Sequence, residues 1–288
     1  MLLEPFSAAF MGRALLGGIL VALICSVTGT WVVTRGMAFL GEAMAHGMLP
    51  GVALAGLLGL PAILGAGVSA LAMTAGVGWL TRRGRLAHDT SIGLLFVGML
   101  ALGVIIVSHS RSFATDLTAI LFGDVLAITE SDLVVLGIAL AATVAIAALF
   151  HRSFLALAFD ERLAAVLGLR PRLASAVLVG LVTTAVVASY GAVGSLLVVG
   201  LLLAPAVAAG RWARSIPRIM ALACAFGVVA VVVGLLVSWH AGTAAGASIA
   251  ASSIALAGLS ALARGLADRT RSTSTTAPNQ EAALNAAP

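Results

Sequence analysis

Long apolar runs, separated by short polar or basic segments, fill most of this chain. A helix that crosses the bilayer core needs about 20 mostly apolar residues. Reading the runs between polar breaks predicts about nine spans, with eight to ten as the range because Gly and Pro interrupt two stretches. The predicted spans are 13–34, 37–58, 61–80, 91–108, 133–150, 173–190, 194–210, 217–237 and 244–263. The pattern therefore predicts an all-α polytopic membrane bundle.

Composition supports a membrane protein and excludes a soluble domain with a large core. Hydrophobic residues make up 61% of the 288 residues and charged residues only 9%, whereas soluble domains average about 25% charged. The net charge of +5 comes from Arg alone. In a membrane protein such a balance reflects cytoplasmic loops, so no nucleic-acid partner is expected.

Four basic clusters orient the predicted helices. By the positive-inside rule they lie on the cytoplasmic side, which with nine spans puts the N-terminus outside and the C-terminus inside. The clusters are Arg82, Arg83 and Arg85; Arg152, Arg162, Arg170 and Arg172; Arg211, Arg214 and Arg218; and Arg264, Arg269 and Arg271. Residues 1–267 form the predicted transmembrane domain. Residues 268–288 are rich in Ser, Thr, Ala and Asn, which predicts a disordered cytoplasmic tail.

The chain contains no Lys, and this absence excludes several activities. A P-loop needs Lys in its G-x-x-x-x-G-K-[ST] motif, so any ATP hydrolysis must come from another chain. Schiff-base chemistry on Lys is likewise impossible. The H-E-x-x-H pair of a zinc protease is also missing. The chain is therefore not expected to be an enzyme.

Glu42 and His46 are the strongest candidates for chemistry, because they lie within a predicted membrane helix. A charged residue at the bilayer centre costs about 2.5–3.5 kcal/mol on insertion scales, and such residues usually handle an ion, a proton or a substrate. Residues at i and i+4 share one helix face, so one Zn²⁺ or Mn²⁺ could contact both side chains. A proton relay and a hydrogen-bonded structural pair remain open as alternatives.

Proline residues mark a weak internal repeat. The segment from Met48 to Gly56, with Pro50 and Gly51, resembles the segment from Leu203 to Gly210, with Pro205. Each closes the second helix of a pair, and the predicted topology runs the two pairs in opposite directions. Broken helices at matching places of inverted repeats indicate a transporter site. Pro50 could also free a backbone carbonyl as a further ligand or kink the helix.

The inner connection 151–172 is the second functional candidate. Apolar residues alternate there with Asp160, Glu161 and Arg162, which predicts a short amphipathic helix at the cytoplasmic surface. Gly168 is expected to end this helix and Pro171 to begin the next span. The outer connection between the fourth and fifth spans holds a further apolar run, 117–126, too short to cross, which predicts a re-entrant or interfacial helix.

The segment 36–51, GMAFLGEAMAHGMLPG, resembles the signature of the membrane permeases of ABC-type zinc and manganese importers. Weaker matches follow in the family's order over roughly 10–260: His88 to Gly93, Leu121 to Asp124, Phe159 to Gly168, and Gly194 to Ala206. The resemblance implies a type II ABC importer-like permease in which Glu42 and His46 are metal ligands on the translocation path. The family usually has Asp where this chain has Glu42.

The resemblance also implies partners and a location. An extracytoplasmic binding protein would deliver the metal, and a separate ABC ATPase would dock on Phe159, Asp160, Glu161 and Gly168. Two permeases would form a homodimer in the bacterial cytoplasmic membrane, with zinc as the expected substrate, manganese as the alternative and no permanently bound cofactor. A proton- or sodium-coupled secondary transporter and a permease for a larger chelate are the rival interpretations.

Overall fold

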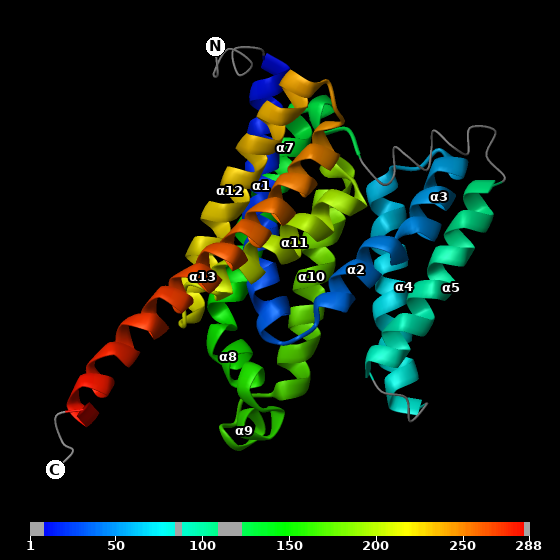
Figure 1. Cartoon of the computed structure of the whole chain (residues 1–288). Helices are drawn as coiled ribbons and strands as arrows, with labels where there is room; N and C mark the ends of the chain where they lie inside the picture. Colours follow the sequence, from blue (N-terminus) through cyan, green and yellow to red (C-terminus); the bar gives the residue numbers. More distant parts are fainter. Residues whose placement is uncertain (1–8, 84–87, 109–122, 285–288) are drawn as a thin grey trace.

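The structure is a computed structural model that describes residues 9–83, 88–108 and 123–284. The described residues form helices connected by short turns (Figure 1). The elements are α1 (Ala9–Thr34), α2 (Ala38–Gly47), α3 (Leu49–Leu58), α4 (Ala62–Arg83), α5 (His88–Ser108), the 3₁₀ turn η2 (Val125–Ala127), α7 (Glu130–Leu149), α8 (His151–Phe159), α9 (Glu161–Val166), α10 (Pro171–Val193), α11 (Ser195–Gly210), α12 (Ile216–Ala241) and α13 (Ala245–Leu284).

The predicted number of crossings is confirmed approximately. Eight apolar helical segments of the described chain are long enough to span a membrane, and α2 and α3 together make one of them, Ala38–Leu58. The remaining predicted span, 194–210, corresponds to α11, which has only 16 residues. At 1.5 Å per residue α11 is about 24 Å long, shorter than the bilayer core of about 30 Å.

The described elements agree with the predicted orientation. The start of α1 and the end of α13 lie at opposite ends of the bundle, and α8 and α9 lie at the end away from the start of α1 (Figure 1). The end of α4 and the start of α10 lie at that same end. The Arg-bearing ends of these helices therefore share one side, as the positive-inside rule requires.

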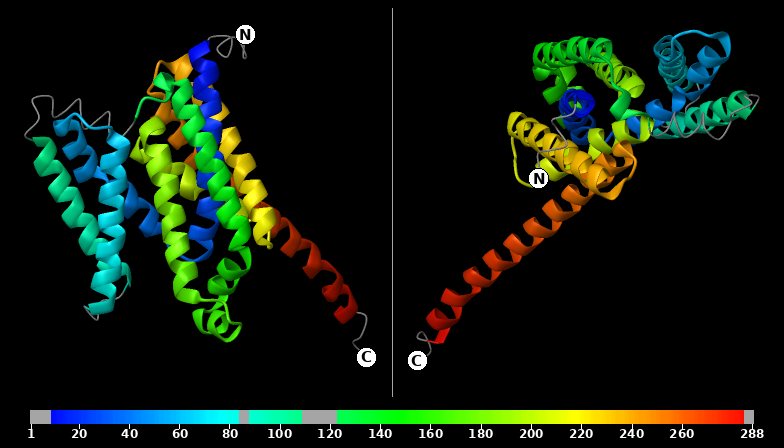
Figure 2. Two further views of the ribbon diagram at one scale, coloured as in Figure 1. Left: turned by 180° about the vertical axis from the view of Figure 1, so that it is seen from behind. Right: turned by 90° about the horizontal axis from the view of Figure 1, so that it is seen from above.

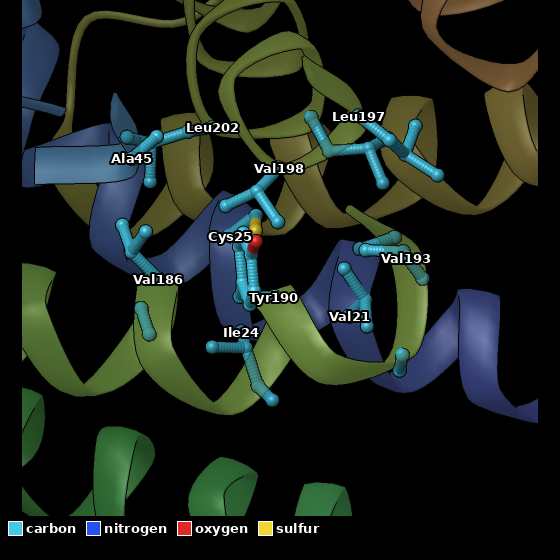
Figure 3. Close-up of a cluster of buried hydrophobic side chains, with 14 of the residues drawn as sticks. Val21, Ile24, Cys25, Ala45, Val186, Tyr190, Val193, Leu197, Val198 and Leu202 are labelled. Atoms are coloured by element: carbon cyan, nitrogen blue, oxygen red, sulfur yellow. The ribbon is translucent and has the colours of Figure 1, made fainter. Parts of the chain in front are cut away.

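The core surrounds α1, which packs against α7, α10, α11 and α12. Figure 3 shows the buried cluster where α1, α2, α10 and α11 meet, with Cys25 of α1 and Tyr190 of α10 among its members. Gly29 is needed at the α1–α11 crossing, because a Cβ there would overlap the carbonyl oxygen of Leu202. Such close approach through small residues is typical of membrane helix packing.

Helices α3, α4 and α5 form an outer unit beside this core (Figures 1 and 2). Gly51 of α3 and Gly65 of α4 bring their backbones together, since a Cβ on either would overlap the other's carbonyl oxygen. Helix α2 contacts α10 and α11 on one side and α4 and α5 on the other. The helix that carries Glu42 and His46 thus joins the outer unit to the core.

Two sequence predictions lie partly outside the described residues. Of the predicted interfacial helix 117–126, the structure describes only 123 onward, where Asp124 caps η2 by accepting the N–H of Leu126 at 3.2 Å. At the other end, α13 continues as helix to Leu284, past the boundary predicted at 268. The division into a membrane domain and a disordered tail stays a prediction.

Candidate metal-translocation site

The site begins at the break between α2 and α3. Pro50 lies in the first turn of α3, and its missing N–H cannot continue the hydrogen-bond ladder of α2. The backbone carbonyls beside the break have partners within the protein. The Ser69 hydroxyl of α4 donates to the Gly47 carbonyl at 2.8 Å, and the Met48 N–H donates to the His46 carbonyl. The break interrupts the helix, and the His46 and Gly47 carbonyls beside it each already accept a hydrogen bond.

Glu42 and His46 line the same pocket, as their spacing predicts. The pocket has a volume of about 320 Å³ and lies between α2, α11 and α13. Glu42 is exposed and His46 is half-buried. The other lining residues are Leu196, Val199, Gly200, Leu203, Ala204, Ala250 and Ile254. A carboxylate and an imidazole thus face a space with otherwise apolar walls, within a membrane-spanning segment.

The two ring nitrogens of His46 have different surroundings. Nδ1 is fully buried and has no hydrogen-bond partner in the part of the chain that the structure describes. Nε2 is therefore the nitrogen left to meet a cation in the pocket. A structural hydrogen bond between Glu42 and Nδ1 is not formed, which disfavours pairing as the purpose of these two residues.

Helix α11 forms the pocket wall opposite Glu42 and His46, and it packs closely against a glycine of α1 and a glycine of α2. Leu202 packs where a Cβ on Gly29 of α1 or on Gly41 of α2 would collide with it. Gly200, Leu203 and Ala204 then face the pocket. Among the described residues no group of three or more His, Cys, Asp or Glu side chains gathers around one point. The described part of the chain therefore offers two candidate ligands, Glu42 and His46, and an apolar wall.

The predicted helix breaks differ in their relation to this pocket. Pro50 and Gly51 do not line it, and Gly51 faces α4 instead. Pro205 lies inside α11 beside the lining residue Ala204. The wall residues of α13 and the aromatic ring of Phe96, which stacks on His46, were missed by the sequence interpretation. No sequence signal marks them, because apolar residues fill every span.

The predicted coupling segment forms two short helices instead of one. Helix α8 ends at Phe159, Asp160 is its C-cap, and α9 begins at Glu161. Gly168 follows α9 with a left-handed φ of +70°, and its N–H and that of Leu169 bond back to Ala165 and Ala164. Gly168 thus ends α9 as predicted, and Pro171 begins α10.

One face of the α8–α9 segment packs against α1, whereas its other face is exposed. Phe154 is fully buried against Trp31 of α1, with ring centroids 5.3 Å apart. Phe159 is 78% exposed and Val166 85% exposed. Helices α8 and α9 lie at the end of the bundle away from the start of α1 (Figure 1), which is the end predicted to be cytoplasmic.

Comparison with known proteins decides the family. The ABC 3 transport family matches residues 7–264. The chain belongs to the ABC 3 transport family. It is 34% identical to the manganese transport system membrane protein MntC of Listeria monocytogenes over 84% of this chain and 86% of that protein. It is 34% identical to the chelated iron transport system membrane protein YfeD of Yersinia pestis, over 85% of this chain and 82% of that protein.

A solved structure of this family shares the fold. PsaBC from Streptococcus pneumoniae, in complex with Fab, matches with a TM-score of 0.80 and 32% identity, over 90% of this chain and 94% of that chain. As an ABC 3 family member the chain is the multi-pass permease of a bacterial metal importer, not an enzyme. A permease of this type works with an ATPase and a substrate-binding protein.

Proposed function

We propose that this permease carries a divalent transition-metal ion past Glu42 and His46, which act as its ligands inside the membrane. The pocket that contains both side chains carries the proposal. Imidazole nitrogen and carboxylate oxygen suit Zn²⁺ and Mn²⁺ alike. Relatives named for manganese favour Mn²⁺ as the cargo, and zinc stays a prediction from the sequence. The longer arm of Glu42, compared with the family's usual Asp, alters the reach of the carboxylate.

The site is completed by a second copy of the chain. Two ligands from one protomer leave most coordination positions of a metal ion open. Glu42 is exposed, and the rim of the pocket includes Leu196, 43% exposed, and Ile254, 62% exposed. A homodimer that closes over this rim would cover apolar surface and bring two ligand pairs to one central path. An extracytoplasmic binding protein would supply the ion to that path.

The segment α8–α9 is the proposed docking site for the ATPase. The exposed Phe159 and Val166 offer apolar contacts, while Phe154 ties the segment to α1. Movement of a docked ATPase would thereby reach α1 and, through Gly29, the pocket wall of α11. Asp160 and Glu161 mark the junction of the two short helices.

The test is metal uptake by cells that contain the chain with its ATPase and binding protein. Glu42→Ala and His46→Ala should each reduce uptake at least about 100-fold, because the ion loses one of two ligands in the membrane. Glu130→Ala and His240→Ala are matched controls, since both residues are exposed at helix ends, and they should keep uptake within about twofold. Normal metal uptake by the His46→Ala variant would overturn the assignment of His46 as a metal ligand.

The same assay separates the rival functions. Comparing Mn²⁺ with Zn²⁺ identifies the cargo. Omitting the ATPase should abolish uptake by the wild type. Uptake that persists without the ATPase and follows a proton gradient would instead show a secondary transporter.

A further inference from the structure

Among the described residues, Nδ1 of His46 lacks the hydrogen-bond partner that usually orients a metal-binding histidine. Such a ring commonly donates its second N–H to a carboxylate or a backbone carbonyl, which fixes its rotation. Nδ1 of His46 is buried without a hydrogen-bond partner among the described residues. An orientation of this ring that turns Nε2 toward the pocket would therefore depend on some other contact.

Phe96 of α5 supplies that contact. Its ring stacks on the His46 ring with centroids 5.7 Å apart and an interplanar angle of 24°. Phe39 packs against Phe96 in turn, edge to face, with centroids 5.7 Å apart and an angle of 70°. Both arrangements are favourable geometries for aromatic pairs. The rings of Phe39, Phe96 and His46 are therefore in contact one after another, from the start of α2 to the proposed ligand His46.

Helix α5 is itself fixed against the α2–α3 break. Gly103 lies seven residues after Phe96, on the same face. A Cβ on Gly103 would come within 2.8 Å of the Leu49 Cβ and 3.1 Å of the Pro50 nitrogen. One face of α5 thus contacts both the His46 ring and the start of α3, so the ring and the kink are held by the same helix.

We propose that Phe96 is a positioning residue that orients the His46 imidazole toward the metal by stacking on it. This inference rests on the proposed metal-ligand role of His46. A flat ring at this distance restricts rotation of the imidazole, whereas an aliphatic side chain of similar bulk would fill the space without restricting it. Phe96 does not touch the ion.

The test is Mn²⁺ binding to the full-length chain assembled with its ATPase, measured by the electron paramagnetic resonance signal of unbound Mn²⁺. Phe96→Leu should weaken binding about three- to tenfold, the range expected for loss of one aromatic pair. Phe96→Tyr keeps the ring and should bind within about twofold of wild type. Leu94→Ala, at a position of α5 that is 61% exposed, is the matched control and should also stay within about twofold.

A double-mutant cycle separates positioning from general structure. In a His46→Ala background, Phe96→Leu should cause no further loss, because the ring it orients is gone. Equal loss by Phe96→Leu in both backgrounds, equal loss by Phe96→Tyr and Phe96→Leu, or no loss by Phe96→Leu would each overturn the inference. Phe96→Met substitutes if Phe96→Leu does not fold. Wild-type binding by His46→Ala would instead overturn the proposed ligand itself.

Discussion

Two proline-containing segments, α2–α3 and α11, lie near each other at the pocket and differ in shape and chemistry. Pro50 separates α2 from α3, and the Gly47 carbonyl bonds to Ser69 of a neighbouring helix. Pro205 lies inside α11, which continues to Gly210. The α2 side carries Glu42 and His46, whereas the α11 side is apolar. Similar local sequences therefore give a bent ligand-bearing helix and an unbroken wall.

The difference shows that the packing around a proline decides whether the helix breaks at that residue. Both prolines are buried. Pro205 lies inside α11, which packs against α1, α12 and α13, whereas next to Pro50 a serine of α4 donates its hydroxyl to the Gly47 carbonyl. The opposite directions of the two segments (Figure 1) agree with the predicted inverted arrangement. The internal repeat itself stays a prediction.

The largest effect is expected where α11 crosses α1. Gly29→Ala places a methyl group against the Leu202 carbonyl, and overpacking of this kind costs about 1–3 kcal/mol or more. We expect the unfolding temperature of the purified protein to fall by roughly 5–10 °C. Gly180→Ala is the control, because nothing lies within 4 Å of a Cβ there, and it should leave that temperature unchanged or slightly higher. Equal behaviour of the two variants would refute the close crossing.

A smaller effect should distinguish the two prolines directly. Pro50→Ala supplies an N–H that can bond to the His46 carbonyl and straighten α2–α3. Uptake should fall at least about fivefold while the amount of folded protein stays near wild type, because the ligand face turns relative to α5. Pro205→Ala should change uptake by less than about twofold. A comparable loss in both variants would show that the α2–α3 break has no special role.

The smallest effect should come from the pocket wall. A Cβ on Gly200 would lie 3.4 Å from the Ala250 Cβ and 3.5 Å from the Ser253 hydroxyl oxygen, which are ordinary contacts. Gly200→Ala should therefore keep both uptake and the unfolding temperature, with uptake within about twofold of wild type. The check is the rate of metal uptake by the Gly200→Ala variant, measured over a range of metal concentrations. A loss as large as that of His46→Ala would show that the ion passes tightly against α11.

Much of the fold could be predicted, because the bilayer core permits only a few kinds of backbone structure. Apolar runs of sufficient length must form helices that satisfy their own backbone, and the Arg clusters orient them. The number of spans was uncertain near 37–80 and 186–212, because Gly and Pro interrupt the apolar runs there; α11, in the second stretch, has only 16 residues. Within 151–172 the structure has two short helices, α8 and α9, which meet at Asp160, where one short helix was predicted.

The candidate site was predictable only in part. The sequence alone determined the membrane setting and the shared face of Glu42 and His46, and it predicted the orientation, because these depend on hydropathy, helical period and charge. Only the tertiary structure decided that α11 and α13 wall the pocket, that the Ser69 hydroxyl donates to the Gly47 carbonyl, and that Phe96 stacks on His46. Those contacts join segments far apart in the chain, and in a membrane nearly every helix face is apolar, so hydropathy cannot say which faces meet.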